Sequence, residues 1–205
     1  RAAIPFGTGG KPVSRTLVRA ALLALALVLV AGCGGNRLQK AGNAAVFDLQ
    51  LETQLDWARV RVPRQEQWTI DGAPLNQLMI LSRIKPREHI FLRAKERSWR
   101  PDGPWFRAGM RPDEVRDIVL DGLRGAGWAN VEARDLRPVR WGATPGLRFD
   151  LDLDNPNGLV YRGMVTAAER DGRLTLLVWM APAEHYYGRD AEAVGRMFDS
   201  LRFVD

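Results

Sequence analysis

The chain has few of the residues that carry most enzyme chemistry. It holds one cysteine, Cys33, and two histidines, His89 and His185, among 205 residues. A single cysteine forms no disulfide within the chain, and zinc sites need several Cys or His ligands at short spacing. A Gly-x-Ser-x-Gly nucleophile motif is absent, and the glycine-rich stretch 122–127 closes a predicted helix instead of opening one. The sequence therefore predicts no metal, no cofactor and no enzyme activity.

A calcium loop is also missing, although Asp150, Asp152 and Asp154 alternate along one stretch. An EF-hand loop requires glycine at its sixth position and glutamate at its twelfth. Counted from Asp150, those positions hold Asn155 and Tyr161. The alternation instead predicts a row of charged side chains on the solvent face of a strand.

The chain lacks an apolar run long enough to span a membrane. Residues 20–30 are uninterruptedly apolar, but a transmembrane helix needs roughly 20 such residues. Arg15 and Arg19 precede the run and small residues follow it, which is the pattern of a secretory signal peptide. We expect residues 1–32 to be a leader and signal peptide, with a buried core helix as the alternative.

The end of this run, Val30-Ala31-Gly32-Cys33, resembles the lipobox of bacterial lipoproteins. The resemblance implies cleavage before Cys33 and acylation of that residue, so that the protein is held at the membrane by lipid. Each buried methylene contributes about 0.8 kcal/mol, and two chains anchor a protein stably. Gly34, where an aspartate would favour retention in the inner membrane, implies an outer-membrane position facing the periplasm. Residues 33–45 are predicted to be the lipidated cysteine and a short polar tether.

Charge argues against a nucleic-acid partner. Four of the 30 basic residues and none of the 24 acidic residues precede Cys33, which leaves a net charge of +2 on the mature chain. Nucleic-acid binding usually requires a concentrated basic face, and here arginines alternate with acids. The stretch 83–100 is the one basic-rich segment. It is interpreted either as a solvated loop or as a patch facing anionic lipid or an acidic partner.

Periodicity predicts a single α+β domain over residues 46–205. Apolar residues at helical spacing after Pro112 predict a helix that ends near Gly125 and Gly127. The segment 174–180 is apolar on both faces, which predicts a central strand. The expected strands are 47–62 with a slip in register, 67–70 and 75–84 joined at Asp71-Gly72, 130–139, 147–154, 159–169 and 174–180; the expected helices are 112–124 and 189–202, the second capped by Asp190.

This order of elements resembles that of the PsbP-like and Mog-like proteins, whose antiparallel sheet carries helices on both faces. The likeness is best over residues 113–204 and includes the final helix with Met197-Phe198-Asp199-Ser200-Leu201. There is also some similarity to uncharacterised proteobacterial lipoproteins. The resemblance implies an α/β/α sandwich and a binding or assembly factor, but a fold does not by itself carry a function.

The segment 86–109 is long and irregular, as functional loops often are. It brings aromatic residues next to arginines, a composition that suits a partner-binding surface; the alternative is that the aromatic rings cap the core. The candidate partner-binding residues are Trp99, Trp105, Phe106, Arg97 and Arg100.

Two functions remain open from the sequence. The first is a membrane-anchored envelope lipoprotein that acts as a non-enzymatic binding or assembly module, with an envelope protein as its partner. The alternative is an envelope enzyme with a site around His185 and Tyr187, because histidine and tyrosine can transfer protons. A pocket at His185 would favour the enzyme, and a surface with exposed Trp99, Trp105 or Phe106 would favour the binding module.

Overall fold

A computed structural model describes residues 36–92, 94 and 100–204. The predicted lipidation site Cys33 and two predicted partner-binding residues, Arg97 and Trp99, lie outside these described residues. Residues Asn36–Asp205 form a compact unit of their own. Within the described part of the chain, no helix is long and apolar enough to cross a membrane.

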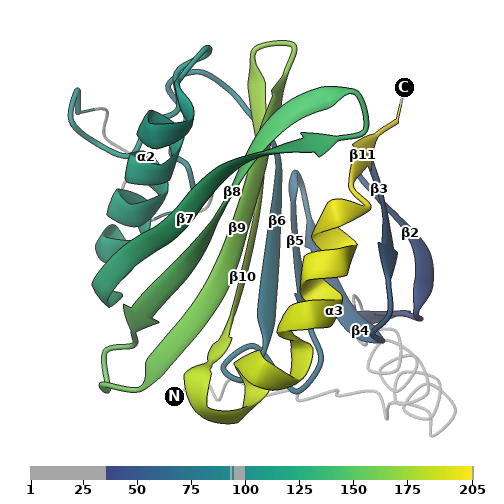
Figure 1. Cartoon of the computed structure of the whole chain (residues 1–205). Helices are drawn as coiled ribbons and strands as arrows, with labels where there is room; N and C mark the ends of the chain where they lie inside the picture. Colours follow the sequence, from purple (N-terminus) through teal and green to yellow (C-terminus); the bar gives the residue numbers. More distant parts are fainter. Residues whose placement is uncertain (1–35, 93, 95–99, 205) are drawn as a thin grey trace, which may run out of the picture. The chain divides into compact units, whose positions relative to one another are not determined.

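The unit is built on an antiparallel sheet of eight strands in the order β1-β4-β5-β6-β10-β9-β8-β7 (Figure 1). A second sheet has three strands in the order β11-β3-β2. The strands are β1 (Asn36–Gln39), β2 (Gly42–Val46), β3 (Leu49–Thr53), β4 (Trp57–Val62), β5 (Gln65–Thr69), β6 (Gln77–Ile84), β7 (Ala129–Trp141), β8 (Thr144–Asp154), β9 (Val160–Arg170), β10 (Arg173–Pro182) and β11 (Arg202–Phe203).

Two helices cover opposite faces of the large sheet (Figure 1). Helix α2 (Pro112–Gly125) packs in the cluster that includes Phe149, Val165 and Val178. Helix α3 (Gly188–Asp199) packs in the second cluster, with Trp57, Trp68 and Trp179. The α+β sandwich expected from the sequence is therefore confirmed.

Strand β10 lies inside the sheet because its side chains are apolar in both directions. It pairs with β6 on one side and β9 on the other. Leu176 and Val178 belong to the α2 cluster, whereas Leu177 and Trp179 belong to the α3 cluster. Both faces are thus buried, as the apolar run predicted.

Helix α2 begins and ends as predicted. The Glu114 carboxylate accepts the backbone N–H of Arg111 at 2.9 Å, which satisfies one donor at the helix start. Val115, Ile118, Val119 and Leu123 are buried against the sheet. Gly127, just after the helix, has a φ of +96°, which a residue with a side chain rarely adopts.

The predicted cap of α3 is wrong. Asp190 lies inside the first turn, where its buried carboxylate accepts the Asn76 Nδ2–H at 2.6 Å and the Arg189 guanidinium. A turn of π-helix, η1 (Ala183–Tyr187), precedes α3. The helix ends at Asp199, and Arg202 and Phe203 pair with β3 as β11.

The predicted tether is shorter than expected, because residues from Asn36 onward belong to the sheets. Strand β1 pairs with β4, and β2 pairs with β3. The single strand predicted over 47–62 is two strands in different sheets, β3 and β4. Strands β5 and β6 pair as expected, but residues 70–76 connect them instead of a tight turn at Asp71-Gly72.

The aspartate row on β8 faces solvent next to arginines, as predicted. Asp152 pairs with Arg134 at 2.5 Å and with Arg162 at 3.6 Å, and Asp150 lies 3.7 Å from Arg137. These carboxylates are satisfied by neighbouring strands, so the row is explained by the sheet surface.

Candidate functional site

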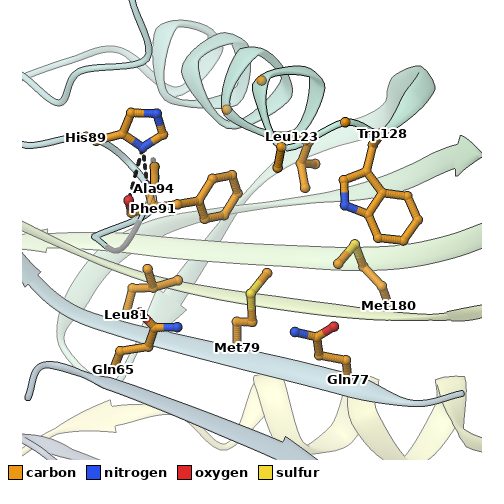
Figure 2. Close-up of a pocket in the computed structure, with 14 residues that line it drawn as sticks. Gln65, Gln77, Met79, Leu81, His89, Phe91, Ala94, Leu123, Trp128 and Met180 are labelled. Atoms are coloured by element: carbon orange, nitrogen blue, oxygen red, sulfur yellow. Dashed lines mark hydrogen bonds between the residues drawn. The ribbon is translucent and has the colours of Figure 1, made fainter. Parts of the chain in front are cut away.

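A cavity of about 490 Å³ lies between the end of α2 and the strands β5, β6 and β10 (Figure 2). Small-molecule sites commonly occupy such concave, mostly apolar spaces of roughly 300–1,000 Å³. Its described lining is Gln65, Gln77, Met79, Leu81, His89, Phe91, Ala94, Gly122, Leu123, Gly125, Ala126, Gly127, Trp128 and Met180.

The floor of this cavity follows from strand alternation. On β6, Gln77, Met79 and Leu81 are spaced by two residues and point toward the α2 face. Gln65 of β5 lies opposite Leu81, and Met180 of β10 lies opposite Gln77. Figure 2 shows these side chains beneath Phe91, Leu123 and Trp128.

The opposite wall depends on a glycine in α2. A Cβ at Gly122 would lie 2.7 Å from Ile90 Cγ2 and 2.8 Å from Phe91 Cε2, so only glycine lets this segment approach the helix. The buried His89 holds the turn, because its Nδ1 accepts the Phe91 N–H at 3.0 Å (Figure 2). The Phe91 ring is thereby placed over the floor.

A second cavity of about 270 Å³ neighbours the first. The two share Gln77, Trp128 and Met180, and the second extends to Pro74, Asn155 and Tyr161. The Trp128 and Tyr161 rings meet edge to face at 5.0 Å. The two neighbouring cavities are together called the α2 groove here.

The described lining of the α2 groove carries no Asp, Glu, Lys or Arg side chain. Its polar side chains are two glutamines, Asn155, His89 and Tyr161, whose hydroxyl donates to the Pro74 carbonyl at 2.6 Å. Burying a charge without a partner is costly. The described part of the lining therefore offers an uncharged and largely apolar surface.

The sequence did not identify this groove. Its residues come from β5, β6, β10, the end of α2 and the segment 89–94, so no local motif contains them. A signal for the groove is present only in part: Met79 and Leu81 alternate with other residues on one strand, and Gln65 and Gln67 alternate in the segment before it.

Exposure of the predicted partner-binding aromatics is contradicted. Trp105 is 4% exposed and Phe106 is fully buried. The backbone N–H of Phe106 donates to the Glu88 carbonyl at 3.0 Å and that of Ile90 to the Pro104 carbonyl at 2.8 Å, so both rings are drawn inward. They cap the core, as the alternative interpretation held, whereas Arg100 lies at the surface.

Part of the basic-rich stretch is engaged in ion pairs. Arg83 lies 3.4 Å from Asp48, and Glu88 binds Arg64 at 2.8 Å. Partial burial of Glu88 acts to raise the pKa of its carboxyl group. The hydrogen bonds from Arg64 and from the Lys85 backbone act in the opposite direction, and the net pKa is lowered. Within the described part of this stretch, Arg83 and Glu88 are therefore engaged with neighbouring segments.

His185 and Tyr187 contact different aromatic rings. His185 is exposed, packs edge-on against the Tyr186 ring at 5.1 Å and lines neither part of the α2 groove. The Tyr187 ring stacks on Trp179 with centroids 5.2 Å apart. Burial, and then the nearby Asp150, raise the pKa of the Tyr187 hydroxyl.

The raised pKa of Tyr187 makes stability fall at alkaline pH. A phenol whose folded-state pKa exceeds its unfolded value of about 10 stabilises the fold fully below that value and loses its contribution as pH rises through the folded pKa. The urea midpoint is expected to fall above about pH 10, and less steeply in Tyr187→Phe. Tyr186→Phe is the control, and an identical alkaline fall in Tyr187→Phe and wild type would contradict the assignment.

The sequence matches no protein-family model, and no curated protein matches it. A crystal structure from Bacteroides thetaiotaomicron is similar over 82% of this chain with 7% identity and a TM-score of 0.46, and the chain spans half the length of that protein. LpqN, described as involved in cell envelope biogenesis of Mycobacterium tuberculosis, is similar over 85% of this chain and 87% of its own, with 10% identity and a TM-score of 0.37.

A mutant of the protein Mog1 is similar over 82% of this chain and 97% of its own, with 10% identity and a TM-score of 0.50. At this identity the likeness concerns the fold alone. The described unit therefore has a Mog1-like α+β sandwich.

Proposed function

We propose that this chain is a lipid-anchored, non-enzymatic binding module of the bacterial envelope, held by Cys33 in the outer membrane and facing the periplasm. The observation that carries the proposal is the lipobox-like Val30-Ala31-Gly32-Cys33 placed directly before a folded unit that begins at Asn36. In this role the unit contributes to envelope assembly by contacting an envelope protein.

The geometry favours binding over catalysis. The α2 groove is a preformed cavity with an uncharged described lining, and its floor carries methionine, leucine and glutamine side chains. Methionine is unbranched and polarizable, and such residues are common on surfaces that accept apolar partners. His185 does not line the α2 groove, so the groove supports the binding role and not the alternative enzyme site.

Lipidation is tested by replacing the cysteine. In cells fed labelled palmitate, the wild-type chain is expected to carry label and to fractionate with the outer membrane, because acylation adds about 0.8 kcal/mol of membrane affinity per buried methylene. Cys33→Ala is expected to lose the label completely and to leave that fraction. Label or outer-membrane recovery that persists in Cys33→Ala would refute the anchor.

Two further variants sharpen this result. Gly34→Asp keeps the cysteine and is expected to keep the label while moving to the inner membrane, by the lipobox resemblance. A pull-down of the wild-type chain from detergent-solubilised envelope tests the binding role. Recovery of no specific protein would count against an envelope protein partner while leaving the anchor intact.

A further inference from the structure

We infer that the α2 groove takes one acyl chain of a phospholipid from the membrane that carries the protein. The inference rests on the proposed function, because the lipid anchor brings the groove to that membrane. It names the ligand class for a cavity whose described lining is uncharged.

The size of the groove fits a single chain. A methylene occupies roughly the volume of a water molecule in the liquid, about 30 Å³. The larger part of the groove measures about 490 Å³, which corresponds to about 16 methylenes. Two chains would need about twice this volume, so one chain of a phospholipid is the part that fits.

The shape of the groove also favours a chain over a compact ligand. Gln77, Met79 and Leu81 form a floor about 13 Å long at strand spacing, and the second cavity lies beside its Gln77 end. Met79 and Met180 stand on adjacent strands, two residues apart in register. Their flexible side chains can adjust to an aliphatic ligand.

The route from the membrane to the groove is marked by exposed apolar residues. On the same face of the sheet, Leu38 of β1 is 63% exposed and Val60 of β4 is 43% exposed. Asn36, Val60, Gln67 and Met79 lie on one cross-strand row, so three strand spacings of about 4.8 Å separate the first strand from the groove floor.

Covalent geometry keeps this row near the anchor. Asn36 is three positions after Cys33, and three extended residues span at most about 11 Å. An anchored chain therefore presents the edge of the sheet, with Leu38 and Val60, close to the lipid surface. Large side chains left exposed in this way often mark contact with a partner or membrane.

Trp128 gives a direct readout of occupancy. The lipidated full-length chain is reconstituted in phosphatidylcholine vesicles whose acyl chains carry bromine, which quenches tryptophan on contact. Trp57, Trp68, Trp141 and Trp179 lie in the cluster on the other face of the sheet. The difference between wild type and Trp128→Phe isolates the emission of Trp128, which is expected to be quenched relative to unbrominated vesicles.

Two glutamines on β5 provide a matched pair of blocking variants. Gln65 lines the groove and Gln67 does not, although both point to the same face. Gln65→Phe is expected to at least halve the quenching of Trp128, and Gln67→Phe to leave it unchanged. Gln77→Phe places a ring in the same space from β6. It is expected to reduce the quenching as well, so the test still holds if Gln65→Phe fails to fold. Quenching that is absent, or equal in all these variants, would overturn the inference.

The occupant is identified separately by mass. The chain extracted from its own membrane is expected to retain one phospholipid in wild type and Gln67→Phe, and to lose it in Gln65→Phe. A retained protein that disappears in Gln65→Phe would instead make a polypeptide the occupant and overturn the inference. Flotation with vesicles reports the anchor and quenching reports the groove, so failure of the proposed function and failure of this inference are distinguishable.

Discussion

Glu66→Ala is expected to lower the free energy of unfolding by about 3 kcal/mol or more, because it removes one partner of a buried ion pair. The Glu66 side chain is fully buried, and its Oε2 lies 2.8 Å from Arg59 Nη2. The same oxygen accepts the Trp68 Nε1–H at 2.7 Å. Alanine would leave a nearly buried guanidinium and an indole N–H without their acceptor.

The effect is expected to spread beyond the pair. Arg59 also donates to the Gln39 side chain of β1 at 2.8 Å, and its guanidinium stands 4.6 Å above the Trp68 ring. Glu66 therefore fixes the arginine that links β1, β4 and β5. We expect Glu66→Ala to expose β1 first, which would appear as faster amide exchange at residues 37–39.

Urea unfolding followed by tryptophan fluorescence measures this loss. Glu66→Gln keeps the shape and one acceptor oxygen, so its loss should be smaller than that of alanine. Glu192→Gln is the control, because Glu192 is 85% exposed in a surface pair with Arg196 and such pairs contribute little. A loss in Glu66→Ala no larger than in this control would contradict the assigned role.

The regular elements of the large sheet could be predicted because their patterns are local. Alternation along 147–154 gave the face of each residue on β8, and the unbroken apolar run at 174–180 gave a strand buried on both faces. The stripe of Val115, Ile118 and Val119 gave α2. In each case the period decides the face of a side chain, although Arg148 on the charged face of β8 is buried because it contacts Asp199 and Phe198 of α3.

The second sheet could not be predicted because its pairing is not local. Strand β11 has two residues, and it pairs with β3 about 150 positions earlier in the chain, Arg202 opposite Gln50. A two-residue strand carries no periodic signal. The small polar residues at 36–45 therefore predict a tether. In the structure they form β1 and β2, which pair with β4 and β3.

The groove escaped prediction for a related physical reason. Its existence depends on where α2 ends above the sheet and on Gly122 admitting Phe91, neither of which is encoded in any single segment. Trp105 and Phe106 show the converse error. The aromatic and basic composition of the segment 86–109 suits a binding surface. Hydrogen bonds between 87–90 and 104–106 instead fold the segment back over the core.

Asn76→Ala is expected to destabilise the fold by about 3 kcal/mol, because it leaves the buried Trp179 N–H without an acceptor and removes a hydrogen bond to the charged Asp190, each costing about 1–3 kcal/mol. Asn76 is fully buried. Its Nδ2 donates to Asp190 at 2.6 Å, and its Oδ1 accepts the Trp179 Nε1–H at 3.1 Å. This amide thereby joins the 70–76 connection, the central strand β10 and the first turn of α3.

Arg189 completes the network, since it binds both Asp190 and Asp71. These carboxylates raise the pKa of Arg189, so the cation stays charged throughout the accessible range. Removing Asn76 leaves Asp190 with this cation but strips Trp179 of its acceptor. Urea unfolding should therefore show a large loss, and amide exchange should be fastest in α3.

Asn76→Asp separates hydrogen bonding from packing. It conserves volume but sets a second carboxylate against Asp190, and two carboxylates at this separation do not both ionise readily. Relative to wild type, Asn76→Asp is expected to be least stable near neutral pH and to recover as pH falls and one carboxyl is protonated. Asn76→Ala has no such group, so its deficit should not recover in this way. Equal pH profiles for the two variants would mean that Asn76 acts through packing alone, and would contradict the role of its hydrogen bonds in joining α3 to the sheet.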